Sequence, residues 1–253
     1  MRHALQCAHK QQPRLPMTLY CLAAALVLLP LSALAGERPL QPFEASFTVS
    51  RNDKPLGTMV MRLESPRAGE WLFSSRTEGE KGLASFLGVT IEERSALHDN
   101  DGALTSSGYR YQQDMVGRHR SRSLEIADGQ ARESDNDERW SYPVAGEVLD
   151  RHAAVLGIAA HLANGAGRGT LFEVPVASKG KLESWRFLVA GAETVDTGEG
   201  RMEAVRVERV RENADRKTVS WHAERYGWLP VRVEQIEPDG ERLVSVLREF
   251  QQQ

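Results

Sequence analysis

Five tryptophans are the side chains of this sequence best suited to binding chemistry. They are Trp71, Trp140, Trp185, Trp221 and Trp228. They fall in several different predicted strands, so a curved sheet could bring them to one concavity. An aromatic-lined cavity suits lipids through buried area and sugars through ring stacking. Ordinary core packing is the alternative for each single tryptophan, and the sequence leaves both interpretations open.

A basic cluster is the second candidate for chemistry. Arg118, Arg120 and Arg122 alternate along a predicted strand, with His119 between them. Alternate residues of a strand share one face, so the three guanidinium groups could meet a phosphate or an anionic glycan together. The alternative is a solvated face whose arginines pair with acidic residues of a neighbouring strand. Together with the tryptophans, the three arginines form the predicted ligand or partner surface.

Motifs for catalysis or metal binding are missing from the sequence. It has no G-x-S-x-G and no H-E-x-x-H segment. The glycine-rich stretch 165–169 follows a predicted helix and precedes a strand, which is the reverse of a phosphate loop. The acidic turns at 99–101 and 135–138 lack the spacing of a calcium loop. We therefore expect a protein that is not an enzyme and that has no cofactor and no metal.

The N-terminus carries the clearest targeting signal. An apolar run from Leu19 to Leu34 follows a basic flank and ends in the small-x-small pattern of Ala33 and Ala35. This pattern predicts a signal peptide, residues 1–35, cut before Gly36. The run is too short and too interrupted by proline for a confident membrane span, although an uncleaved anchor is the alternative. We expect residues 36–253 to form a single β domain in the periplasm, without a membrane span after cleavage.

Cleavage would change the charge and the redox chemistry of the chain. It would remove Arg2, Lys10 and Arg14 and no acidic residue, so the formal net charge would move from −3 to −6. An acidic product argues against nucleic acid as a partner and against tight binding to an anionic membrane surface. Both cysteines, Cys7 and Cys21, fall in the removed segment. The mature chain would therefore have no disulfide and no thiolate chemistry.

Beyond residue 43 the dominant hydrophobic period is two, which predicts strands. The segment Phe43–Val49 alternates apolar and polar residues, and similar segments recur every 8–12 residues up to Phe250. Turn pairs such as Asn52-Asp53 and Asp128-Gly129 separate them. This pattern predicts a mainly β protein, built on a curved, partly closed antiparallel sheet of the half-barrel or β-spiral type.

One segment breaks the strand pattern. Residues 148–163 carry apolar side chains at helical spacing, with Leu149 and Leu156 on one face and Ile158 on another. Asp150 is the expected N-cap, and Asn164 with Gly165 is the expected stop. A helix that is apolar nearly all round should be buried. We therefore expect it to lie against the concave side of the sheet.

Several segments of the C-terminal half carry a family resemblance. They are Glu193-Thr194-Val195 with Thr197 and Gly200, Arg216 to Trp221, Tyr226-Gly227-Trp228-Leu229-Pro230, Asp239-Gly240 and Leu247, with Tyr109 and Leu149-Asp150 upstream. In this order they resemble the DUF3108 family of exported bacterial proteins, from about Phe43 to Phe250. The resemblance implies a periplasmic protein of unknown function, a half-closed β structure similar to lipoprotein-carrier folds, and no catalytic residues. The chain departs from the family after Asp150, where Arg151-His152-Ala153 replaces an early Pro or Ser.

Together these observations predict a function class rather than an activity. We expect an exported, non-enzymatic protein of the cell envelope that binds a lipid or other apolar ligand, or an envelope protein partner. One alternative is a structural module that docks through its surface by edge-strand pairing. Another is an enzyme acting on envelope glycan or lipid, for which His119 beside the arginines is the best support.

Overall fold

The computed structural model describes residues 40–80, 88–100, 102–212 and 216–253. The predicted signal peptide, its cleavage site at Ala35 and Gly36, and both cysteines lie outside the described residues. Within the described part of the chain, no helix is long and apolar enough to cross a membrane.

Fifteen strands of the described chain form one sheet. The first eight are β1 (Phe43–Arg51), β2 (Lys54–Arg67), β3 (Glu70–Gly79), β4 (Thr90–Asn100), β5 (Ala103–Met115), β6 (Arg118–Ala127), β7 (Gln130–Asp135) and β8 (Glu138–Pro143). The others are β9 (Leu149–Asp150), β10 (Leu171–Ser178), β11 (Lys181–Thr197), β12 (Gly200–Val210), β13 (Lys217–Ala223), β14 (Leu229–Ile236) and β15 (Arg242–Gln252). The strand pattern predicted from residue 43 onward is thus confirmed.

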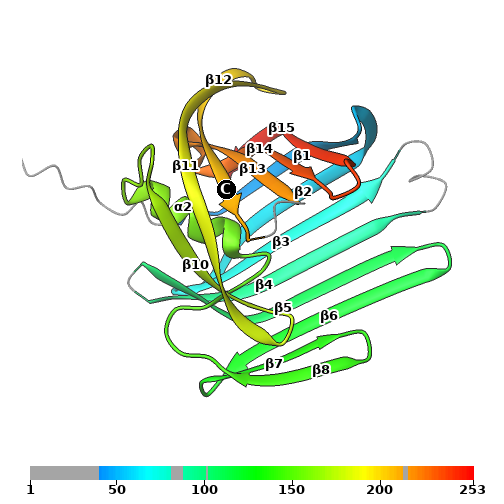
Figure 1. The fold of residues 1–253 in the computed structure, drawn as a ribbon, viewed down its shortest axis with the longest axis vertical. Helices are drawn as coiled ribbons and strands as arrows, with labels where there is room; N and C mark the ends of the chain where they lie inside the picture. The colour runs from blue at the N-terminus through cyan, green and yellow to red at the C-terminus, as the bar shows by residue number, and fades with distance from the viewer. Residues whose placement is uncertain (1–39, 81–87, 101, 213–215) are drawn as a thin grey trace, which may run out of the picture. The chain divides into compact units, whose positions relative to one another are not determined.

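The strand order follows the chain almost without crossovers. It runs from β8 back to β1, then to β15, and back again to β9, so the first and last strands pair with each other. Neighbouring strands are antiparallel, except that the short β9 is parallel to β10. The sheet ends at β8 and β9 and does not close into a barrel. Figure 1 shows β3 to β8 side by side and the β11–β12 hairpin turning away from that layer.

One hydrophobic core draws on strands far apart in this order. Phe47 of β1, Phe73 of β3 and Val207 of β12 belong to the same buried cluster, together with Leu247 of β15. A flat sheet cannot bring such distant strands to one core, so the sheet curves around it. The predicted curved, partly closed β-sheet is therefore correct.

Helix α2 (Ala154–Ala163) packs inside this curvature, against β9, β10 and β14. Leu156 is 1% exposed and belongs to the same core. Gly157 permits the close approach, because a Cβ there would lie 2.9 Å from Leu149 Cδ1. The prediction of one buried helix is confirmed, but its start is corrected. The helix begins at Ala154, whereas the preceding Leu149–Asp150 forms β9.

A buried carboxylate explains this later start. Asp150 accepts hydrogen bonds from Ser95 Oγ (2.9 Å) and Ser106 Oγ (2.7 Å), and from the backbone N–H groups of His152 (2.8 Å) and Ala153 (2.9 Å). The side chain therefore caps the turn before the helix, whose N-cap residue is Ala153. The two serines lie on β4 and β5, so the same carboxylate joins the helix start to the sheet.

Candidate functional site

A cavity of about 690 Å³ opens on the concave side of the sheet. Seven basic side chains line it: Arg120, Arg122, Arg151, Lys179, Arg209, Arg211 and Arg216. Three acidic side chains, Asp135, Glu138 and Glu183, also line it, so the lining has an excess of four positive charges. Tyr111, Trp140 and Trp185 add aromatic surface. This accumulation of positive charge occurs in a protein whose whole sequence carries a net charge of −3.

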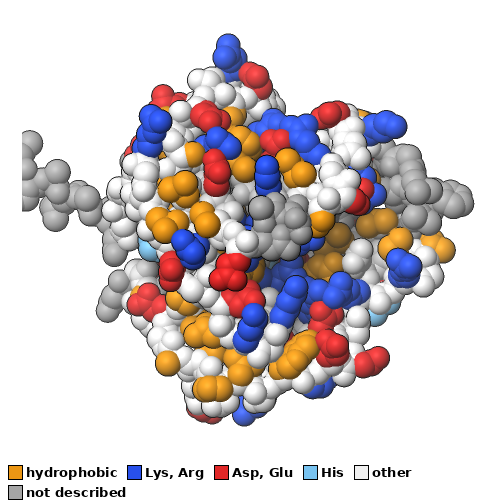
Figure 2. Space-filling model, viewed as in Figure 1, with side chains coloured by type: hydrophobic (Ala, Val, Ile, Leu, Met, Phe, Trp, Pro, Cys, Tyr) orange, Lys and Arg blue, Asp and Glu red, His pale blue; other side chains and the backbone are white. Residues whose placement is uncertain are grey.

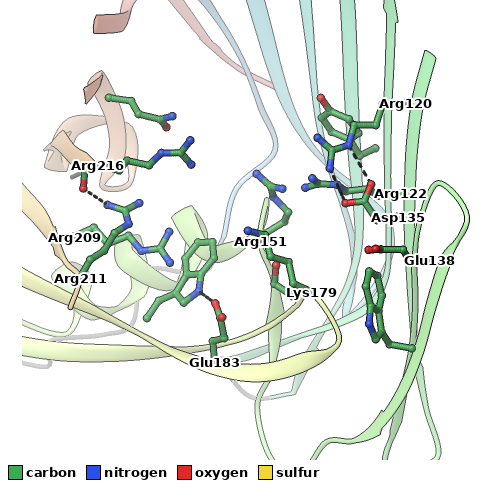
Figure 3. Close-up of a pocket in the computed structure, with 15 residues that line it drawn as sticks. Arg120, Arg122, Asp135, Glu138, Arg151, Lys179, Glu183, Arg209, Arg211 and Arg216 are labelled. Carbon is green, nitrogen blue, oxygen red and sulfur yellow. Dashed lines mark hydrogen bonds and ion pairs between the residues drawn. The ribbon is translucent and has the colours of Figure 1, made fainter. Parts of the chain in front are cut away.

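Two walls of the sheet place these groups opposite each other. Figure 3 shows Arg120 and Arg122 on one side, Arg209, Arg211 and Arg216 on the other, and Arg151 between them. In Figure 2, Lys and Arg side chains gather around a hollow on this face of the molecule. The alternation of strand side chains sets up each wall, because the residues that point inward on neighbouring strands are paired in register.

The positive charge of the β6 wall is partly neutralised within the wall. Tyr111, Arg122 and Asp135 are register partners on β5, β6 and β7. Asp135 accepts two hydrogen bonds from Arg120, at 3.1 and 2.8 Å, and lies 2.7 Å from Arg122 Nε. Burial acts to raise the pKa of Asp135, but the Arg120 hydrogen bond and the two positive charges hold it below its ordinary value. This carboxylate therefore stays ionised and offsets part of the arginine charge.

The β12 wall is built differently, because an aromatic ring supports its central cation. The Arg209 guanidinium stands over the Trp185 indole, 3.4 Å from the ring centroid. Trp185 donates its Nε1–H to Glu183 Oε2 at 2.9 Å, which fixes the ring. Arg211 donates to Thr218 Oγ1 at 3.0 Å and to the backbone oxygen of Arg216 at 3.4 Å. Both guanidinium groups are thus held in place by neutral groups.

Arg151, Arg209 and Arg211, the arginine trio below, have no carboxylate in ion-pair contact within the described residues. Burial lowers the pKa of Arg209 to about 10, and the charges of Arg211 and Arg151 add to this effect. Burial and the Arg216 charge also lower the pKa of Arg211. A lowered arginine pKa means that the fold holds the charged form at a cost in free energy. The arginine trio therefore carries positive charge that no ion pair neutralises, and Glu183 and Glu237 act on Arg209 and Arg211 only at longer range.

A side chain joins the two ends of the sheet at the edge of the cavity. Glu133 of β7 accepts hydrogen bonds from the backbone N–H groups of Lys179 and Gly180, both at 2.8 Å, and from the Tyr142 hydroxyl at 3.0 Å. Gly180 has φ +77°, and a Cβ there would lie 2.5 Å from Trp140 Cδ1. The β10–β11 turn therefore rests directly on the β7–β8 wall, where no strand pairing closes the sheet.

Comparison with known proteins places the chain in a family. A family model described as a protein of unknown function (DUF3108) matches residues 46–247. The chain belongs to the DUF3108 family. No curated protein matches it.

Two solved structures are similar to this DUF3108 protein. One is a β-barrel-like protein of the domain of unknown function DUF1849 from Brucella abortus, at 9% identity and a TM-score of 0.51, with 85% of this chain and 98% of that chain covered. The other is a protein with a YmcC-like fold from Bacteroides fragilis, at 14% identity and a TM-score of 0.29, with 84% and 95% covered. The first likeness shows a shared fold and nothing about function.

The DUF3108 fold brings together half of the residues predicted for the ligand or partner surface. Trp140, Trp185, Arg120 and Arg122 line the cavity. Arg120 and Arg122 pair with Asp135 of the neighbouring strand, as the alternative interpretation expects, and they also line the cavity.

The other predicted residues lie elsewhere in the DUF3108 fold. Trp71 and Trp228 are half-buried against the main core. Trp221 is buried in it and donates its Nε1–H to Glu193 at 2.8 Å. Arg118 is exposed at the start of β6, outside the lining of the cavity. These positions agree with core packing for three of the five tryptophans.

Sequence reasoning missed the arginine trio and Lys179. Arg209 lies at the end of a strand and Arg211 directly follows it, so their alternation resembles the signal of Arg120 and Arg122. Arg151 stood out only as a departure from the family pattern after Asp150. Nothing in the sequence shows that these positions meet, because their proximity depends on how the DUF3108 sheet curves.

The apolar space beside helix α2 is smaller than the basic cavity. It measures about 170 Å³ and is lined in part by Leu104, Leu156 and Ala160. His119 pairs with Asp114 at 2.6 Å on the exposed β5–β6 hairpin. Within the described residues, no group of three or more His, Cys, Asp or Glu side chains could hold a metal ion.

Proposed function

We propose that this protein is an exported, non-enzymatic binding protein of the cell envelope, whose ligand is anionic and sits in the arginine-lined cavity. The observation that supports this most strongly is the arginine trio. Three guanidinium groups line a cavity of about 690 Å³ without an ion-pair partner in the described chain, and Glu183 attracts Arg209 only at longer range. Groups with strongly perturbed pKa values in a concave site are typical of functional sites.

The charge of the cavity favours an anion over a neutral apolar ligand. A neutral lipid would remove water from Arg151, Arg209 and Arg211 without replacing it by any acceptor, which costs free energy. An anionic group restores both the charge balance and the hydrogen bonds. The apolar ligand predicted from sequence fits this site only if it carries an anionic head, with its remainder against Tyr111 and Trp140.

The ionised carboxylates of the site support a binding role rather than catalysis. Burial acts to raise the pKa of Glu183, but hydrogen bonds from Trp185 and Lys181 hold it below its ordinary value. Asp135 is also held below its ordinary value. General acid–base catalysis near neutral pH needs a pKa close to that pH, so neither carboxylate is suited to it.

Export is supported by the basic flank, apolar run and Ala-x-Ala pattern of the first 35 residues. The test is expression of the full chain in a bacterium with an outer membrane, followed by fractionation and mass measurement. We expect a periplasmic protein that begins at Gly36. A protein that stays in the membrane fraction with its N-terminus intact would contradict this part of the proposal.

Native mass spectrometry of that periplasmic protein tests the binding role. We expect an anionic adduct on the wild type that is lost from Arg209→Gln and Arg211→Gln. Arg201→Gln is the matched control, because Arg201 is an exposed arginine at the other end of β12. A neutral lipid adduct that survives in all variants would favour the apolar carrier instead. A single protein partner captured by crosslinking regardless of these variants would favour docking through the surface.

A further inference from the structure

We infer that the anionic group is a phosphoryl group, a phosphomonoester dianion seated between Arg151, Arg209 and Arg211. This inference rests on the proposed function and names the chemistry of its ligand. It follows from where the arginines without an ion-pair partner lie and from how the guanidinium groups are held.

The arginines without an ion-pair partner are concentrated on one side of the cavity. Arg120 and Arg122 share Asp135, and Arg216 donates to Glu237 at 2.8 Å. The arginine trio has no such partner within the described residues, and the charges of Arg151 and Arg211 lower the pKa of Arg209. A carboxylate would supply one negative charge to three cations. A phosphomonoester supplies nearly two charges and three acceptor oxygens, which is the closer match.

The arginine side chains keep donors free for this group. A guanidinium carries five N–H donors in a planar fork that fits phosphate geometry. Arg209 is held by its stacking on Trp185, and its guanidinium donates no hydrogen bond to another described residue. Arg211 uses its two Nη groups on Thr218 and Arg216 and is thereby fixed in orientation. Because stacking and neutral acceptors fix both side chains, little conformational entropy remains to be lost on binding.

The remainder of the ligand extends toward the opposite wall. From the trio the cavity continues to Tyr111, Trp140 and the Arg120–Arg122 pair, as Figure 3 shows for the labelled arginines. Aromatic rings accept a sugar ring or the glycerol part of a headgroup. A soluble phosphorylated sugar and the exposed phosphate of phosphatidic acid both present the same phosphomonoester. The experiment below separates these two sources.

The protonation of the phosphoryl group gives a signature that a carboxylate lacks. Its second pKa is about 6, so lowering the pH from about 7.5 to about 5 removes one of its charges. The groups that face it are the arginines, Lys179, Tyr111 and the carboxylates of Asp135, Glu138 and Glu183. Asp135 and Glu183 have lowered pKa values, and burial raises that of Tyr111. Next to Arg151, burial lowers the pKa of His152. Glu138 is the remaining carboxylate of the lining, and a Glu138→Gln variant excludes it as the cause of a difference in affinity between the two pH values.

The test is a set of calorimetric titrations of the processed full chain. The probes are inorganic phosphate, glucose 6-phosphate, sulfate and glucuronate, with Arg201→Gln as the control variant. We expect glucose 6-phosphate to bind at about pH 7.5 and to bind about tenfold more weakly at about pH 5. Arg209→Gln and Arg211→Gln should each weaken it about tenfold or more, and Arg201→Gln should leave it unchanged. Sulfate, which keeps two charges, should bind with no such pH dependence.

The outcomes separate this inference from the proposed function. Glucuronate binding as tightly as glucose 6-phosphate, with equal affinity at both pH values, would overturn the phosphoryl assignment and leave an anion-binding cavity. Absence of binding by every anion would overturn both. Vesicles of phosphatidylcholine with phosphatidic acid distinguish the sources. If the wild-type protein sediments with these vesicles and Arg209→Gln does not, the ligand is a lipid phosphate. If the protein binds only the soluble probes, the ligand is a free phosphoester.

Discussion

The Arg209 guanidinium stands 3.4 Å from the centroid of the Trp185 indole ring, on the wall of the basic cavity. The ring face attracts the cation without neutralising it, so the guanidinium edge still offers donors to a ligand. This arrangement holds a charge in position for binding rather than for stability of the fold.

Replacing Arg209 should therefore separate binding from stability. Burial lowers its pKa to about 10, so at every pH below that value the folded state holds the charged form at a cost. Arg209→Met removes this cost and also the stacking of about 1 kcal/mol on Trp185. We expect the free energy of unfolding to be no lower than that of the wild type, and anion binding to be lost. A variant that unfolds much more easily in urea would show that Arg209 is structural.

The Glu133 contact should control access at the edge of the cavity. Glu133→Ala removes the acceptor of the Lys179 and Gly180 N–H groups, which then exchange through opening of the β10–β11 turn. We expect faster hydrogen exchange at these two amides, with core amides such as that of Val207 unchanged. Glu125→Ala, on the exposed face of neighbouring β6, is the control. Unchanged exchange at Gly180 would mean that other contacts hold the turn.

Asp150 should be the most sensitive polar residue of the core. It is fully buried and accepts four hydrogen bonds, so Asp150→Ala leaves Ser106 without its acceptor and Ser95 with only His152 Nδ1 as a partner. We expect a loss of about 3 kcal/mol or more in the free energy of unfolding, measured by urea titration. Asp137→Ala in the exposed β7–β8 turn should change it by less than about 0.5 kcal/mol. Equal effects of the two substitutions would contradict the role of Asp150 in holding the start of helix α2.

Acid should destabilise the protein through buried histidine. His222 is fully buried and bonds to Ser220 Oγ and the Trp228 carbonyl, both at 2.8 Å, and burial lowers its pKa to about 4. The unfolded chain takes up the proton near pH 6.5, so stability is complete above that pH and falls as the pH drops toward about 4. This loss amounts to about 3 kcal/mol. NMR titration should show a neutral His222 ring at about pH 5. A protonated His222 ring at that pH would refute this account.

The strands could be predicted because their information is local. Alternation in Phe43–Val49 and positive-φ turn pairs such as Asp128-Gly129 specify strand and turn without reference to distant residues. The start of helix α2 could not be predicted in this way. The helical spacing extends back to Val148, but Asp150 is taken up by Ser95 and Ser106, which lie more than forty residues earlier in the chain.

The residues of the candidate site also divide into those that local sequence patterns indicate and those that depend on the fold. The sequence indicates Arg120 and Arg122 because they alternate on one strand, and Trp140 and Trp185 because of their residue type. The meeting of β6 with β12 depends on the curvature of fifteen strands, so the sequence did not place Arg209 and Arg211 opposite Arg122. Arg151 lies in the turn that Asp150 caps, and it lines the cavity from there. Local patterns thus supply the parts of the site but not their convergence.

Observation of the arginine side chains during anion titration tests the central claim most directly. In ¹H–¹⁵N spectra, the Nε–Hε signals of Arg151, Arg209 and Arg211 should shift together as inorganic phosphate is added, with one dissociation constant. The signals of Arg118 and Arg201, outside the cavity, should stay in place. Equal shifts of all arginine signals, or shifts that leave the arginine trio unchanged, would contradict an anion-binding cavity in this protein.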